Sequence, residues 1–99
     1  MKPRKLRAPE EVRALIREMH PGIKMKVKAA LAAVLINPDH GKPLRDDLLG
    51  LRSVRAGQLR IIYRTAPGII ELVALGPRRT IYEETLRLLR RDTQEEKGS

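Results

Sequence analysis

The chain has 99 residues, a formal net charge of +9, no cysteine, and two tyrosines as its only aromatic residues. This length supports one domain with a modest core, and the lack of cysteine excludes disulfides and thiolate metal ligands. No apolar run approaches the roughly 18–20 residues of a membrane span, and the basic start lacks the apolar segment of a signal peptide. We expect one soluble, cytoplasmic domain over residues 1–99, with its core over about 6–89 and a frayed tail over 92–99.

The positive charge is concentrated in the first four fifths of the chain. Residues 1–41 carry a net charge of +5, residues 42–80 carry +5, and residues 81–99 carry −1. A folded domain with this charge attracts polyanions, such as nucleic acid or an acidic protein partner. The alternative is that the charge only keeps a small domain soluble.

Two helices are predicted in the first third of the chain. One follows Pro9, which suits a first helical turn, and its apolar stripe has helical spacing. The stripe consists of Val12, Leu15, Ile16 and Met19. A second helix runs from about Ile23 until Asn37-Pro38, so the short connection predicts a helical hairpin. Residues 4–7 fit either a short edge strand or a disordered arm.

The second half predicts strands and a final helix. Residues 39–50 have the glycine and proline content of a loop. Branched residues and tight turns then predict strands over 53–56, 59–66 and 69–75, and helical spacing predicts a helix over 80–91. Within the middle strand, alternation places Leu59, Ile61 and Tyr63 on one face and Arg60, Ile62 and Arg64 on the other. The order predicts an α+β domain, in which the N-terminal helical hairpin packs on a small antiparallel sheet with a C-terminal helix.

Most catalytic motifs are absent from the sequence. It has no phosphate-binding loop, no dinucleotide-binding turn, no Ser/His/Asp set and no metal-ligand cluster, so we expect no cofactor and no metal. His20 and His40 stand beside proline or glycine, where exposed positions are expected. The adjacent acidic pairs Asp46-Asp47 and Glu83-Glu84 diverge, which predicts solvated or capping roles.

Arginines on the predicted sheet are the remaining candidates for chemistry. Arg60 lies within a strand, Arg55 lies across the preceding turn, and Arg78 and Arg79 follow the last strand shortly before Tyr82. Pairing of these strands would gather guanidinium groups and a phenol at one end of the sheet. Guanidinium matches phosphate in a bidentate manner and stabilises the charge of a phosphoryl transition state. Alternatively, Arg60 and its neighbours extend into solvent from an ordinary outer face.

Two segments resemble the RelE/ParE superfamily of type II toxin–antitoxin toxins. SVRAGQLRIIYR (residues 53–64) is similar to the family segment R-x-G-x-x-R-x-x-Y, and ALGPRRTIY (residues 74–82) is similar to a later G-x-R…Y segment. The resemblance extends from about Leu6 to Leu89 and includes the order of the elements. It implies a toxin that is neutralised by a cognate antitoxin, which is acidic and partly disordered, in a toxin–antitoxin hetero-oligomer.

For ribosome-dependent members, the resemblance implies metal-independent mRNA cleavage, in which a 2′-hydroxyl attacks its own 3′-phosphate in the ribosomal A site. Arg60 would stabilise the phosphate, and Arg78 and Tyr82 would assist proton transfer, so these three residues are the expected catalytic set. The basic residues predicted to bind nucleic acid are Arg52, Arg55, Arg64 and Arg79.

The sequence departs from this pattern on the strand before the Gly57 turn. The best-studied nuclease members carry two lysines there, whereas this chain has Arg52, Ser53 and Arg55 and no lysine. Arginine is a poor general base near neutral pH, so the proton acceptor is unassigned. The alternative is a ParE-like, gyrase-inhibiting toxin or a catalytically degenerate one. Plain nucleic-acid binding is disfavoured by the scarcity of aromatics for base stacking.

Overall fold

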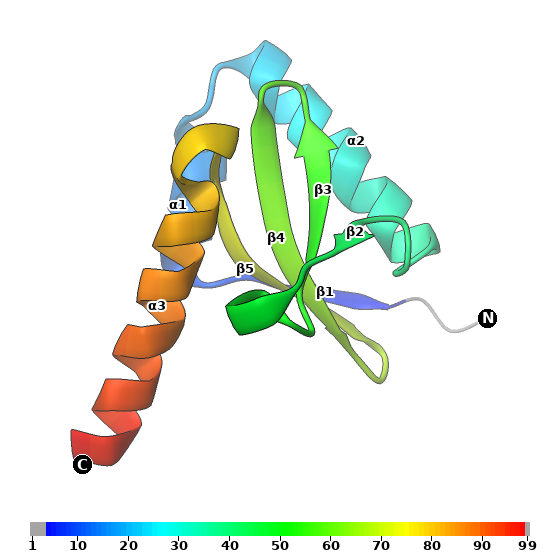
Figure 1. The fold of residues 1–99 in the computed structure, drawn as a ribbon. Helices are drawn as coiled ribbons and strands as arrows, with labels where there is room; N and C mark the ends of the chain where they lie inside the picture. Colours follow the sequence, from blue (N-terminus) through cyan, green and yellow to red (C-terminus); the bar gives the residue numbers. More distant parts are fainter. Residues whose placement is uncertain (1–3, 99) are drawn as a thin grey trace.

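Five strands form a single mixed sheet in the order β1-β5-β4-β3-β2, with helices on both faces (Figure 1). The computed structural model describes the backbone of residues 4–98 and the side chains of residues 4–90. The strands are β1 (Lys5–Arg7), β2 (Lys42–Pro43), β3 (Arg52–Ala56), β4 (Leu59–Ala66) and β5 (Ile69–Pro77). The helices are α1 (Glu10–Glu18), α2 (Pro21–Ile36) and α3 (Arg78–Gly98), with a 3-10 turn at Asp46–Leu48.

The predicted α+β class is confirmed, with three differences in detail. β1 forms from the segment that the sequence left open, and it pairs with β5 in parallel, so the sheet is mixed and not purely antiparallel. β2 lies within the predicted loop, because its two residues pair with the start of β3. β5 continues through Gly76 to Pro77, so α3 begins at Arg78 and extends to Gly98, past the predicted end at Arg91.

The two faces of the sheet have separate apolar cores. Val27, Leu31 and Val34 of α2, with Val12 of α1, pack against one face. On the other face, Ile81 of α3 packs with a cluster from the loop before β3 and from the central strands. The residues of that cluster are Leu51, Ile62, Ala74 and Ile81. The alternation predicted for β4 is confirmed, since Ile61 and Tyr63 contribute to the first core and Ile62 to the second.

A β-bulge shifts the alternation within β5. Tyr63 is paired with Leu72 and Ile62 with Ala74, so Val73 has no partner on β4. Leu72 packs in the helical-hairpin core, while Val73 and Ala74 both pack on the α3 side. A bulge inserts one extra residue and changes which face the following residues occupy.

The Tyr63 hydroxyl connects the loop after α2 to the sheet by hydrogen bonds. This fully buried hydroxyl donates to the carbonyl of Pro38 at 2.8 Å and accepts from the Gly41 amide at 2.8 Å. A Cβ on Gly41 would lie 2.5 Å from this hydroxyl, so only glycine fits there. Burial raises the pKa of Tyr63, because the phenolate form would lose hydration.

Tyr63→Phe is expected to lower the free energy of unfolding by about 1–3 kcal/mol, because it leaves the Gly41 amide and the Pro38 carbonyl unpaired. The raised pKa also means that the folded chain holds this proton more tightly than the unfolded chain does. The stability that this pKa shift of Tyr63 provides is complete below about pH 10, and it declines as the pH rises towards the folded-state pKa. Urea unfolding from pH 8 to 11 measures both effects. Equal pH dependence in Tyr63→Phe would show that Tyr63 is not the source.

Candidate nucleic-acid site

Two arginines face each other at one end of the sheet. Arg55 of β3 is directly opposite Arg60 of β4, and Arg60 is directly opposite Gly76 of β5. Directly paired residues share a face, which here is the α3 side, because Arg60 alternates with Ile61 on β4. Like charges in this arrangement are destabilising. Gly76 has no side chain of its own, and the Cδ1 atom of Ile81 lies 3.2 Å from the position that a Cβ on it would occupy. The arrangement therefore favours an anion at this position.

Arg78 and Arg79 add to the same end of the sheet. Leu59 is paired with Pro77, so α3 begins beside the first residues of β4. Both arginines are exposed and occupy the first turn of the helix, which contains no acidic residue. The helix dipole disfavours cations at this end and attracts anions. We call Arg55, Arg60, Arg78 and Arg79 the arginine site.

The arginine site has no carboxylate partner among the residues that the structure describes. The ion pairs among the described residues all join residues outside this site. Arg55 donates a hydrogen bond from its Nε atom to the Gly57 carbonyl at 2.9 Å. Arginines that serve stability are normally paired, whereas no ion pair in the described part of the chain offsets the cross-strand repulsion between Arg55 and Arg60. A bound phosphate would relieve it.

Tyr82 lies over the sheet next to the arginine site. One helical turn after Arg78, the half-buried ring of Tyr82 packs with the α3-side core, and its hydroxyl lies 3.4 Å from the Oγ atom of Ser53. Ser53 is buried and is two residues from Arg55 on β3, on the same face. The phenol therefore extends from α3 across the sheet to β3, on the face that carries Arg55 and Arg60.

Glu84 is a residue that the sequence reasoning set aside. Its Oε2 atom lies 3.7 Å from the position that a Cβ on Gly76 would occupy, and Gly76 is paired with Arg60. The exposed carboxylate therefore overhangs the arginine site, although no ion pair joins it to an arginine in the described part of the chain. The spacing from Gly76 through Ile81 is the sequence feature that bears on Glu84. It indicates that Glu84 lies near Arg60 only when α3 is known to pack on the sheet.

Arg52 and Arg64 lie apart from the arginine site. Arg52 is on the opposite face, where its guanidinium donates to the Gly41 carbonyl at 2.7 Å and pairs with Asp39 at 3.3 Å. Arg64 is four residues along β4 from Arg60, roughly 13 Å at the rise of a strand. Its guanidinium pairs with Glu71 of the neighbouring strand. The structure therefore brings together five of the seven predicted residues: Arg55, Arg60, Arg78, Arg79 and Tyr82.

A sequence model described as the ParE toxin of the type II toxin–antitoxin system parDE matches residues 4–82. This match covers most of the chain and both segments that form the site. The chain belongs to the ParE toxin family. It is therefore a type II toxin of the RelE/ParE superfamily. No curated protein sequence matches the toxin.

Solved structures agree with this assignment. The toxin is 27% identical to a chain of the toxin–antitoxin complex RelBE2 from Mycobacterium tuberculosis, with a TM-score of 0.66, 78% of this chain covered and 100% of that one. A free Escherichia coli RelE double mutant shares the fold at 17% identity, with a TM-score of 0.70, 91% of this chain covered and 98% of that one. So does a chain of the archaeal RelE–RelB complex from Pyrococcus horikoshii, at 16% identity and a TM-score of 0.62, with 78% and 97% covered.

The described residues contain neither a cluster of metal ligands nor a helix suited to a membrane. No group of three or more histidine, aspartate or glutamate side chains there is placed to hold a metal ion. None of the described helices combines the length and apolarity needed to cross a bilayer.

Proposed function

We propose that the toxin is a ribosome-dependent mRNA endonuclease of the cytoplasm, which inhibits translation until a cognate antitoxin binds it. The observation that carries this proposal is the cross-strand pair of Arg55 and Arg60, which has no carboxylate partner among the described residues. Such a pair suits a ligand whose negative charge grows during the reaction, as it does on a phosphate under attack.

The proposed reaction uses only groups of the RNA and of this chain. The 2′-oxygen of the RNA forms a bond to its own 3′-phosphorus, and the bond from phosphorus to the 5′-oxygen of the next nucleotide breaks. The products are a 2′,3′-cyclic phosphate and a 5′-hydroxyl. One proton must leave the 2′-hydroxyl, and one must reach the departing 5′-oxygen.

Arg60 and Arg78 stabilise the charge on the phosphoryl oxygens, since guanidinium remains protonated near neutral pH. Glu84 accepts the 2′-hydroxyl proton, because a carboxylate is a competent general base and this one overhangs Gly76 beside Arg60. Tyr82 donates a proton towards the 5′-oxygen. In this proposal Arg55 and Arg79 hold the RNA, whereas Arg52 and Arg64 serve the fold.

Primer extension on mRNA after induction of the toxin tests this function. Cuts that recur at codon spacing and disappear when translation is blocked are expected. Intact transcripts together with induction of the DNA-damage response would instead support a ParE-like inhibitor of gyrase. That second candidate is favoured by the description of the family whose model matches the chain.

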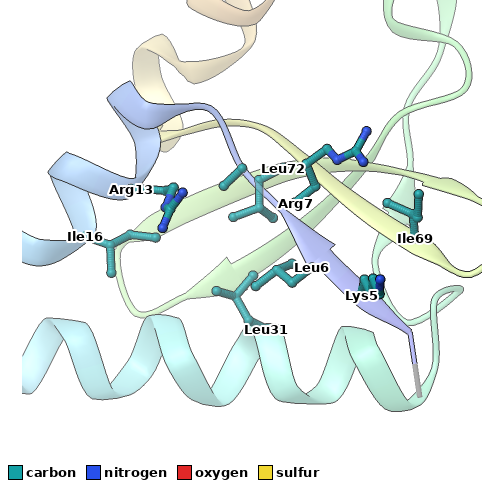
Figure 2. Close-up of a pocket in the computed structure, with 9 residues that line it drawn as sticks. Lys5, Leu6, Arg7, Arg13, Ile16, Leu31, Ile69 and Leu72 are labelled. Atoms are coloured by element: carbon teal, nitrogen blue, oxygen red, sulfur yellow. The ribbon is translucent and has the colours of Figure 1, made fainter.

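A groove on the opposite side of the molecule is a candidate site for the antitoxin. It has a volume of about 390 Å³ and lies beside β1, the edge strand, under α1 and α2 (Figure 2). Its apolar lining includes Leu6, Ile16 and Leu31, and its charged lining consists of Lys5, Arg7 and Arg13. The RelE-like chains in the solved RelBE2 and RelE–RelB structures are bound to antitoxins. An acidic segment with apolar side chains would complement this groove and could pair with the free edge of β1.

Leu6→Glu is expected to weaken antitoxin binding at least tenfold, because Leu6 lies against Leu31 in the groove and its replacement puts a negative charge where an acidic segment binds (Figure 2). Leu15→Glu is the matched control, since Leu15 is similarly exposed on α1 and does not line the groove. Titration calorimetry with the cognate antitoxin measures both. Equal losses, or no loss with Leu6→Glu, would place the antitoxin elsewhere.

A further inference from the structure

Lys26 of α2 lies against the turn that joins β3 to β4. A Cβ on Gly57 would be 3.0 Å from the Cδ atom of Lys26 and 3.6 Å from its Nζ atom. Gly57 has a φ of +65°, so its backbone conformation favours glycine. In Figure 1 this turn meets the first half of α2 at the end of the molecule where α3 begins.

Cations from two elements therefore flank one turn. The Nε atom of Arg55 donates to the Gly57 carbonyl from the β3 side, and the ammonium group of Lys26 approaches the same glycine from the α2 side. Gln58, the other residue of this turn, is exposed and can donate hydrogen bonds from its side-chain amide. Lys26 is exposed too, and in the described part of the chain no carboxylate pairs with it. By contrast, Lys24 donates to the carbonyl of Arg17.

Packing alone does not account for this arrangement. A lysine that served only solubility would have no need to lie against a turn, yet the stem of Lys26 packs on Gly57 and its ammonium group stays exposed beside it. Arg55 is also paired with Arg60, so the turn leads directly from the arginine site to α2. A chain of phosphates that passed over the turn would meet Arg60, then Arg55 and then Lys26.

We propose that Lys26, Arg55 and Gln58 form a second phosphate site for single-stranded RNA, which holds a nucleotide neighbouring the one that is cleaved. This proposal rests on the proposed nuclease function. Lys26 binds the backbone and takes no part in proton transfer, so its removal affects substrate binding and not the chemical step.

The test compares Lys26→Gln with Lys28→Gln. Both remove one charge from exposed positions on α2, but Lys28 is about 200° around the helix from Lys26 and so lies on the other flank. For cleavage on programmed ribosomes, Lys26→Gln is expected to raise KM about fivefold and to leave kcat within twofold. The slope of log affinity for a short single-stranded RNA against log salt should become shallower by about 0.7, the value for one phosphate contact. Lys26→Arg should restore both, and Lys28→Gln should match the parent.

Three outcomes would overturn the second phosphate site. Unchanged KM and salt slope in Lys26→Gln would show that Lys26 does not contact RNA. Equal changes in Lys28→Gln would show a general effect of net charge. Weakened antitoxin binding with unaltered RNA binding would assign the turn to the protein partner. A parent toxin that cuts no mRNA would refute the proposed function separately, since RNA binding by the variants still tests the turn.

Discussion

Arg60→Ala is expected to lower the rate of mRNA cleavage on ribosomes about 10²–10³-fold and to relieve growth arrest. The reason is that a preorganised cation beside the scissile phosphate stabilises the transition state more than the ground state. The loss should therefore appear mainly in kcat. Single-turnover cleavage of mRNA on programmed ribosomes measures it directly. Arg60→Lys should recover only part of the rate, because an ammonium group cannot bind two phosphoryl oxygens in the bidentate manner of guanidinium.

The same substitution should not destabilise the fold. Removal of Arg60 relieves its repulsion with Arg55, so the free energy of unfolding is expected to remain equal or to rise slightly. Arg64→Ala is the matched control on the same strand. It breaks only the pair with Glu71, and should keep the cleavage rate within twofold and lower stability by at most about 1 kcal/mol. Full activity in Arg60→Ala would remove Arg60 from the proposed mechanism.

Glu84→Gln is expected to reduce kcat by about 10²–10⁴-fold with little change in KM, the usual effect of removing a general base. Glutamine keeps the size of the side chain and removes its ability to accept the 2′-hydroxyl proton. Glu84→Asp should retain more activity, because it keeps the carboxylate but retracts it by one methylene group.

Glu83→Gln controls for charge in that experiment. Glu83 is the adjacent residue of α3 and is also exposed, so each variant carries one negative charge fewer than the parent. Glu83→Gln should cleave like the parent. Comparable losses in the two variants would point to the overall electrostatic field of the molecule, and retained activity in Glu84→Gln would leave the proton acceptor among the solvent or the RNA groups.

Local patterns in the sequence predicted most of the fold and the central arginines. The alternation of Leu59 to Arg64 and the Gly57 turn are short-range signals, and together they place Arg55 opposite Arg60. Pairing of β1 with β5 was not predictable in the same way, because three residues join a strand more than sixty positions later. No local pattern predicts such a parallel contact.

The remaining parts of the site depend on tertiary contacts. Glu84 approaches Gly76 only because Ile81 and Thr85 bury one side of α3 against the sheet. Lys26 reaches Gly57 only because Val27, the next residue, anchors α2 on the other face. In the sequence, both charged residues have the appearance of ordinary solvated positions on amphipathic helices. Their roles are set by which helix covers which face.

The unpaired Val73 has a consequence for comparison within the family. If Val73 were paired with Ile62 and the ladder continued without the bulge, Leu75, not Gly76, would lie opposite Arg60, and an isobutyl group would lie beside the arginine. Counting residues back from the start of α3 therefore identifies the partner of Arg60 correctly, whereas counting forward from the β4–β5 turn gives an answer that is off by one. A relative with the same residues that paired them without this bulge would therefore have a different residue beside the arginine.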